Sequence, residues 1–297
     1  MSAPSMTAVA MVRTCRPRSA LLRPGMALAA GLLALLGSCS HRSVAEFAQQ
    51  VAEVPGKTAI RIEVENGTIG VAASSDRSIH IGGGVRRAAD SAEMLARLEA
   101  VPLTFRTVED PKRPELLVLR SPALPEGASG ILGLELGVHL PADLPLEIVI
   151  TGSGHVTLGD RKAPSQVRTG RGDLRFENCA GGVVAKTGSG NVIAFGHRGD
   201  VDLQTNLGDM QVFVREPGSK VRLITGQGTV QCYLPTVAQF EVDARVEKGK
   251  IGNSFGLTAE RVQEFGAVLV GTVGSGATKV ILRSGSGHIA LSAKDEP

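Results

Sequence analysis

The chain has 297 residues, of which 42% are hydrophobic and 3% aromatic, and its 37 glycines accompany one tyrosine and no tryptophan. The formal charge is +3, but four arginines lie in residues 1–39, which contain no Asp or Glu, so the remainder holds 28 basic and 29 acidic residues. This near neutrality, with no basic run among aromatics, argues against a nucleic-acid partner, and the glycine content, above the usual share of about 7%, predicts many turns.

The N-terminal segment has the pattern of a secretory signal. Basic residues from Arg13 to Arg23 precede the apolar run Met26–Leu36, which is too short to span a bilayer, since a spanning helix needs about 20 residues. Leu36-Gly37-Ser38-Cys39 resembles the lipobox of bacterial lipoproteins, which implies cleavage before Cys39 and lipid attachment to its thiol. The alternative is an ordinary secretory signal with a chance cysteine.

These features predict the cellular location of the protein and the nature of its first two segments. Several acyl chains on one residue form a stable membrane anchor. We therefore expect a signal peptide over residues 1–38 and a lipid-anchored protein of the cell envelope, at the outer membrane, on its periplasmic or surface face. Residues 39–57 are expected to be a tether.

Residues 58–144 predict a β-rich cap with one short helix. Ile60 to Val71 alternate apolar residues around a glycine. Ser91 is a plausible N-cap for a helix that runs to Ala100. Three strand-like runs come after it, separated by proline-rich turns: Leu103–Val108, Leu116–Leu119 and Ile131–Leu140. Terminal units of a repeat protein must shield its open end, so this segment should cap the repeats of residues 145–292.

A repeat fills residues 145–292, and residues 293–297 are left as a tail. Thr-Gly-x-Gly or a close variant begins at Thr151, Thr169, Thr187 and Thr205, 18 residues apart, and again 20 residues later at Thr225. Three further frames begin at Val246, Phe265 and Ser284. Apolar residues recur at every second position on both sides of the clearer glycine corners, which indicates two short strands per unit.

Units of this length cannot bury their own apolar face, so consecutive units must stack. Two strands and two turns in 18–21 residues suit one rung of a parallel β-solenoid, with rungs about 4.8 Å apart. The fold class is therefore predicted to be all-β, a β-helix-like solenoid behind a small cap.

The repeat also explains the tripeptide Arg171-Gly172-Asp173, which has the sequence of a cell-adhesion motif. Gly172 and Asp173 occupy positions that Gly and His, Asn, Asp or Thr fill in neighbouring frames, so we expect a structural corner. A phosphate-binding loop is excluded because it needs a third glycine and a following helix, or Gly-Lys-Ser/Thr.

One polar repeat position should form a ladder along an edge of the solenoid. His155, Asp173, Asn191, Asp209 and Thr229 come directly after the second glycine of their frames. Side chains of this kind satisfy backbone amides in turns, and this is the favoured interpretation. The alternative is a ligand or cation site at Asp173, Asn191 and Asp209, because stacked oxygens could hold calcium.

The sequence contains no specific catalytic or metal-binding motif, and we expect no cofactor. Asp200 and Asp202 alternate on one predicted strand, which could place two carboxylates on one face, as a polysaccharide-cleaving enzyme could use. The simpler explanation is that both side chains point outward into solvent. His155 and His288 lie seven frames apart, about 30 Å, too far to share a metal. Cys179 and Cys232 are three rungs apart, about 14 Å, and should be free thiols because a disulfide needs Cα atoms within about 7 Å.

Residues 58–292 resemble the bacterial putative-adhesin family of β-solenoid domains of unknown function. The resemblance rests on Ile62-Glu-Val-Glu-Asn-Gly-Thr-Ile, on Leu146-Glu-Ile-Val-Ile-Thr-Gly-Ser-Gly and on the closing Val280-Ile-Leu-Arg-Ser-Gly-Ser-Gly-His-Ile. It implies a β-solenoid with an adhesion role, which is a label rather than a demonstrated mechanism.

Two functions are compatible with these features. We expect a membrane-anchored, non-catalytic interaction or scaffold module whose strand faces meet an envelope glycan or protein. The alternative is a carbohydrate-active β-helix enzyme. A cleft lined by Asp or Glu from neighbouring rungs would favour the enzyme, and a smooth face of short mixed side chains would favour binding.

Overall fold

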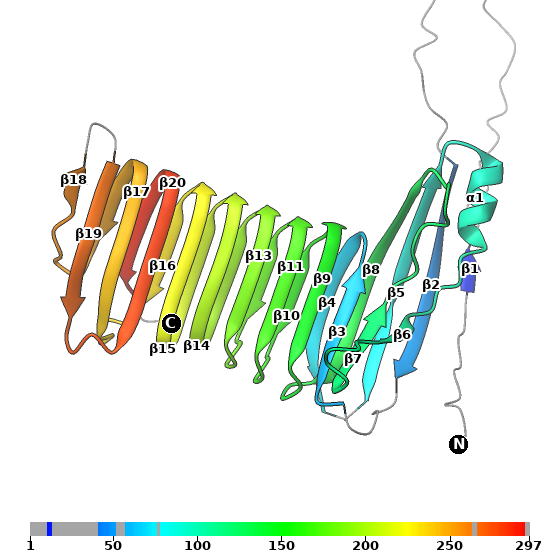
Figure 1. The fold of residues 1–297 in the computed structure, drawn as a ribbon, viewed down its shortest axis with the longest axis horizontal. Helices are drawn as coiled ribbons and strands as arrows, with labels where there is room; N and C mark the ends of the chain where they lie inside the picture. Colours follow the sequence, from blue (N-terminus) through cyan, green and yellow to red (C-terminus); the bar gives the residue numbers. More distant parts are fainter. Residues whose placement is uncertain (1–10, 14–40, 52–56, 76–77, 263–265, 295–297) are drawn as a thin grey trace, which may run out of the picture.

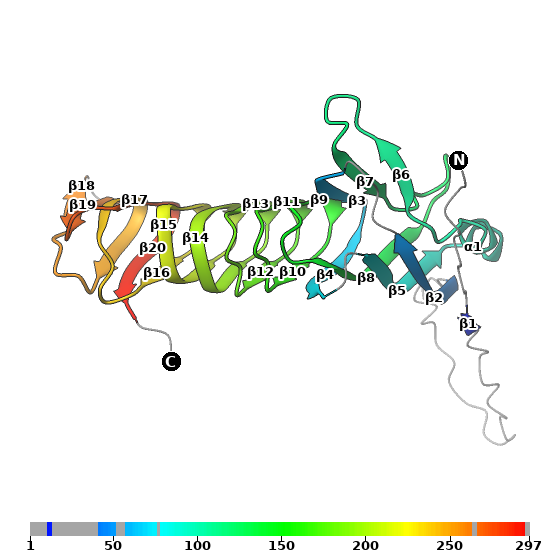
Figure 2. The same ribbon diagram turned by 90° about the horizontal axis from the view of Figure 1, so that it is seen from below.

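The computed structural model of the chain describes residues 11–13, 41–51, 57–75, 78–262 and 266–294. Strands stack side by side into an elongated body with helix α1 (Ala92–Glu99) at one end (Figure 1). Figure 2 shows two sheet layers along most of its length. The prediction of an all-β solenoid with a small cap is confirmed.

The first sheet takes one strand from every rung, and its strands run parallel. In spatial order it contains β7 (Leu116–Arg120), β3 (Ala59–Val64), β9 (Leu146–Ser153), β11 (Ser165–Arg171), β13 (Val183–Ser189), the C-terminal halves of β14 (Val192–Leu207) and β15 (Met210–Gln227), and the N-terminal halves of β20 (Thr278–Ala293) and β17 (Phe240–Asn253).

The second sheet lies across the core from the first and is also parallel. It contains β8 (Ile131–Pro141), β4 (Gly67–Ser74), β10 (Val156–Gly159), β12 (Leu174–Glu177), the N-terminal halves of β14 and β15, β16 (Val230–Leu234), and the C-terminal halves of β20 and β17. Alternate residues of both sheets point inward because the side-chain period of a strand is two. Inward rows such as Ile62, Ile148 and Val167 are fully buried.

The cap extends the second sheet with antiparallel strands. β5 (Ile79–Ala89) pairs with β8, β2 (His41–Val51) pairs with β5, and β1 (Met11–Arg13) pairs with β2. β6 (Arg106–Glu109) pairs with β7 in the same antiparallel way. Helix α1 begins as predicted, since the Ser91 hydroxyl oxygen accepts a hydrogen bond from the Met94 amide at 3.1 Å, and Leu98 is buried.

Two predicted boundaries differ from the structure. Most of the expected tether, residues 39–57, is strand β2, whose Ala45 and Phe47 are buried. Of the residues next to these two, only Glu46 is polar, while Val44 and Ala48 are apolar, so the alternation was too weak to recognise. The unit at Ile60 to Val71 is not separate from the solenoid, because β3 and β4 pair directly with β9 and β10. The solenoid therefore begins at residue 59, inside the predicted cap.

The last rungs do not follow chain order. β20 lies between the rung that begins at Thr225 and the rung that begins at Val246, pairing with β15 and β16 on one side and β17 on the other. The Phe265 frame is not a rung, since β19 (Gly266–Val273) runs antiparallel to β17, and β18 (Glu260–Val262) runs antiparallel to β19. His288 thus lies five rungs from His155, about 24 Å, rather than the seven expected.

Candidate binding surface

The Arg171-Gly172-Asp173 tripeptide lies at the corner that joins β11 of the first sheet to β12 of the second. Gly172 has a φ of 131°, which residues with a side chain adopt only under strain. A Cβ there would lie 2.0 Å from the carbonyl oxygen of Gly154 in the preceding rung. The corner interpretation is confirmed, because stacked rungs bring backbone against backbone at this point.

A buried hydroxyl ladder runs beside the glycine corners. Thr187 Oγ1 donates to the carbonyl oxygen of Gly172 at 3.0 Å, and Thr205 Oγ1 donates to that of Gly190 at 3.0 Å. The hydroxyls of Thr225 and Ser284 make the same bond to the preceding rung. Sequence reasoning missed this role, although the signal was present: a hydroxyl residue opens nearly every clear frame.

The polar ladder at the turns has the geometry expected of amide-satisfying side chains. His155 Nδ1 accepts from the Asp173 amide at 3.1 Å, Asp173 Oδ1 accepts from the Asn191 amide at 2.7 Å, and Asn191 Oδ1 accepts from the Asp209 amide at 2.9 Å. Asp209 Oδ1 continues the series to Thr229. Among the described residues, no group of three His, Cys, Asp or Glu side chains could hold a metal ion. Cation binding at Asp173, Asn191 and Asp209 stays a sequence-based alternative.

Carboxylates on the outer side of the first sheet are held by cations. Asp202 contacts Lys220 Nζ at 3.0 Å and Arg222 Nη1 at 2.7 Å. Burial by itself would raise the pKa of Asp202, but the hydrogen bonds from Lys220 and Arg222 outweigh it and lower the pKa. Asp200 accepts hydrogen bonds from the Ser219 hydroxyl and the Lys220 amide. Asp202, with its pKa lowered in this way, is unsuited to donate a proton near neutral pH.

Two other carboxylates of this sheet are similarly occupied. Glu147 binds Arg61 and Arg113, and Asp243 binds Arg245 and Arg283. Burial favours a higher pKa for each carboxyl group, but the hydrogen bonds from the arginines prevail and lower it. Asp202, Glu147 and Asp243 thus each bind two cations, and the outer face of the first sheet carries a network of ion pairs.

Three aromatic side chains form an outward ladder on the second sheet. The Phe195 and Phe213 rings stack with centroids 4.9 Å apart, and the Phe213 and Tyr233 rings with centroids 4.1 Å apart. Arg175 lies over the Phe195 ring, and Lys294 lies over the other two. Because ring faces are turned to one another, the ladder stabilises the rung stack. All three residues share one repeat position, a signal that the sequence contained.

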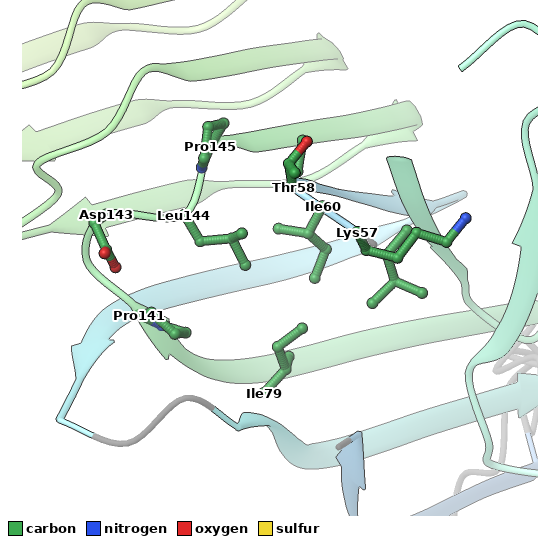
Figure 3. Close-up of a pocket in the computed structure, with 10 residues that line it drawn as sticks. Lys57, Thr58, Ile60, Ile79, Pro141, Asp143, Leu144 and Pro145 are labelled. Atoms are coloured by element: carbon green, nitrogen blue, oxygen red, sulfur yellow. The ribbon is translucent and has the colours of Figure 1, made fainter. Parts of the chain in front are cut away.

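A small cavity of about 220 Å³ lies where the first rung meets the cap. Figure 3 shows the Ile60, Ile79 and Leu144 side chains turned toward a shared space, while the Lys57 ammonium points away from it. Lys57 Nζ instead donates to the Pro114 carbonyl. Apolar side chains form most of the lining, and the polar residues Lys57, Thr58 and Asp143 do not converge on a shared point.

Residues 147–292 match the family described as Toastrack DUF4097. They cover the solenoid from β9 to β20. This part of the chain is a Toastrack domain. The parallel rung of β3 and β4 lies outside the matched residues.

Several solved structures are similar to this chain at low identity. A putative cell adhesion protein from Clostridium sporogenes is 13% identical, with 83% of this chain and 99% of that chain covered and a TM-score of 0.35. A putative adhesin from Parabacteroides merdae is 11% identical, with 84% and 96% covered and a TM-score of 0.33. A putative lipid binding protein from Parabacteroides distasonis is 11% identical, with 82% and 96% covered and a TM-score of 0.28. No curated protein matches the chain. Likenesses this distant support no inference about function.

The interior of the Toastrack domain contains a polar column at the second corner of three successive rungs. Arg161, Cys179 and His197 are all fully buried, and their rungs are joined by backbone hydrogen bonds at Ala180 and Arg198. Arg161 Nη1 donates to the Pro141 carbonyl at 2.6 Å. Burial lowers the pKa of Arg161 and of His197 and raises that of the Cys179 thiol. Arg161 also donates to the Leu144 carbonyl, so this one side chain clamps the turn between β8 and β9.

The state of the thiols agrees with the prediction. Cys179 and Cys232 are free and buried in the Toastrack domain. Burial raises the pKa of Cys232 to about 12, so the thiolate needed for nucleophilic chemistry is suppressed. Neither cysteine is a candidate nucleophile.

The expected lipid-attachment residue, Cys39, lies outside the described residues. In the ranges that the structure covers, no helix is long and apolar enough to cross a membrane.

Proposed function

We propose that the protein is a membrane-anchored, non-catalytic envelope lipoprotein whose adhesin-like solenoid serves as an interaction or scaffold module. Lipid attachment at Cys39 supplies the anchor, and the outer faces of the two sheets supply the contact surface.

The observation that supports a non-catalytic role is that the outward carboxylates are held in ion pairs. Asp202, Asp243 and Glu147 each contact two cations. A hydrolase acting on polysaccharide needs one carboxyl group that is protonated near working pH, whereas the pKa values of these three are lowered. The next outward residues on their strands are Val149, Gln204 and Arg245, so the face mixes apolar, amide and charged side chains, and this supports binding rather than cleavage.

The position of β2 refines the anchoring proposal. β2 begins at His41, two residues after Cys39, and two residues of extended chain reach at most about 7 Å. A lipid on Cys39 would therefore hold the cap close to the bilayer surface, leaving no room for a long tether. We expect proteases to leave the cap attached to the membrane.

The test is fractionation and protease treatment of cells that produce the protein with a C-terminal epitope tag. Wild type and Cys15→Ala, the matched control, should stay in the membrane fraction, and Cys39→Ala should be released. Digestion on intact cells would indicate the surface face, and digestion only after permeabilisation would indicate the periplasmic face. Membrane retention of Cys39→Ala would refute the lipoprotein proposal.

A further inference from the structure

Two exposed cations stand side by side on the first sheet. Arg168 on β11 and Lys186 on β13 are in register, one rung or about 4.8 Å apart, and both side chains are exposed. Neither makes an ion pair with a described residue. Like charges directly opposite each other on neighbouring strands destabilise a sheet, so this arrangement is unfavourable for folding alone.

The neighbouring carboxylates are already neutralised. Register places Glu147 on β9 two positions before the partner of Arg168, and Asp202 on β14 two positions before the partner of Lys186. Glu147 is held by Arg61 and Arg113, and Asp202 is held by Lys220 and Arg222. The positive charge of Arg168 and Lys186 is thus left for an anion from outside the chain.

The surroundings favour a ligand with both carboxylate and hydroxyl groups. Gln166 precedes Arg168 on the same outward side of β11, and Gln204 continues the row after Lys186. Amide side chains both donate and accept hydrogen bonds, as sugar hydroxyls require. Arg171, also exposed, adds a further cation at the end of β11.

A polymer running along the solenoid axis would meet these residues in succession. The rows of a parallel sheet repeat at every rung, so an extended chain of sugars can place successive groups on successive rungs. Nucleic acid is less suited to this surface, since the aromatic ladder on which bases could stack lies on the other sheet.

We propose that Arg168 and Lys186 form a binding subsite for the carboxylates of an acidic polysaccharide on the first sheet. This inference rests on the proposed interaction role and names the class of its partner. Gln166 and Gln204 bind hydroxyl groups beside the two cations.

The test measures binding of the full-length protein, purified in detergent, to polygalacturonate, with neutral dextran as the comparison polymer. Wild type should bind polygalacturonate, more weakly as salt rises, and should not bind dextran. Arg168→Gln combined with Lys186→Gln should weaken binding about tenfold or more. The matched control, Arg245→Gln, removes an exposed arginine of the same sheet that pairs with Asp243 and should bind as wild type does.

Thermal unfolding separates loss of the subsite from loss of the fold. The double variant should melt at the wild-type temperature or slightly above it, because a like-charge contact is removed. Equal binding by wild type and double variant, or absence of polygalacturonate binding, would overturn the proposal. Binding to phosphatidylglycerol vesicles but not to polygalacturonate would also overturn it, in favour of a membrane surface. None of these results alters the Cys39→Ala fractionation, on which the anchoring proposal depends.

Discussion

The hydroxyl ladder predicts a cost for removing one hydroxyl group from the middle of the solenoid. In Thr205→Val the side chain keeps its shape but can no longer donate to the Gly190 carbonyl, 3.0 Å away. A hydrogen bond contributes about 0.5–1.5 kcal/mol, and an acceptor left without a partner costs about 1–3 kcal/mol. Residue 205 is only 2% exposed, so the added methyl group gains some apolar burial and offsets part of this loss. We expect the free energy of unfolding to fall by about 1–2 kcal/mol.

Urea unfolding followed by far-ultraviolet circular dichroism measures this change, since a chain with one Tyr and no Trp gives little fluorescence. Thr157→Val is the matched control. Thr157 is exposed on β10, and surface substitutions usually change stability by less than about 0.5 kcal/mol. If both variants unfolded at the same urea concentration, the assignment of a stabilising role to the hydroxyl ladder would be wrong.

Three further predictions concern the corner, the ion pairs and the thiols. Gly190→Ala should lower the free energy of unfolding by about 2–3 kcal/mol or more, because its Cβ would lie 2.1 Å from the Gly172 carbonyl oxygen. Gly252→Ala is the control and should cost far less, since Gly252 has open space around it. Thermal unfolding measures the stability of both variants. The pKa of Asp202 is lowered on folding, so its ion pairs stabilise above the unfolded value of about 3.9 and lose their effect as pH falls through the folded value. The stability difference between wild type and Asp202→Asn should therefore be present at pH 7 and vanish in acid, and a constant difference would contradict this. The Cys232 thiol, with a pKa of about 12, should resist a thiol reagent until urea unfolds the protein, and rapid labelling of folded protein would exclude its burial.

Much of the architecture could be predicted because the local sequence of each rung determines its two strands and its glycine corner. The glycine at each corner, the alternation of apolar residues and the 18-residue spacing are local properties, so they identified the two strands of a rung. The same local pattern identified Gly172 and Asp173 as corner residues rather than an adhesion motif. The hydroxyl and aromatic ladders each occupy one repeat position, so the sequence contained their signal, but sequence reasoning missed both.

Features of the candidate surface that depend on pairing could not be predicted in this way. The ion pair between Asp202 and Arg222 joins residues in register on neighbouring strands. Arg168 and Lys186 make no ion pair with a described residue because the nearby carboxylates already bind other cations. Residues 41–51 were assigned to a tether because their two buried side chains gave too weak an alternation. Only docking against β5 shows that this segment is a strand.

The sequence alone determined the repeat, the corner chemistry, the free thiols and the near-neutral charge of the chain after residue 39, because these depend on residue type and spacing. The tertiary structure decided the order of the final rungs, with β20 placed between β15 and β17, and which cations of the described strands pair with a carboxylate. The physical reason is that every rung offers its neighbour a similar edge of backbone groups and apolar rows. Because a similar edge can pair with more than one strand, the order of the final rungs is decided only when all of the rungs pack together.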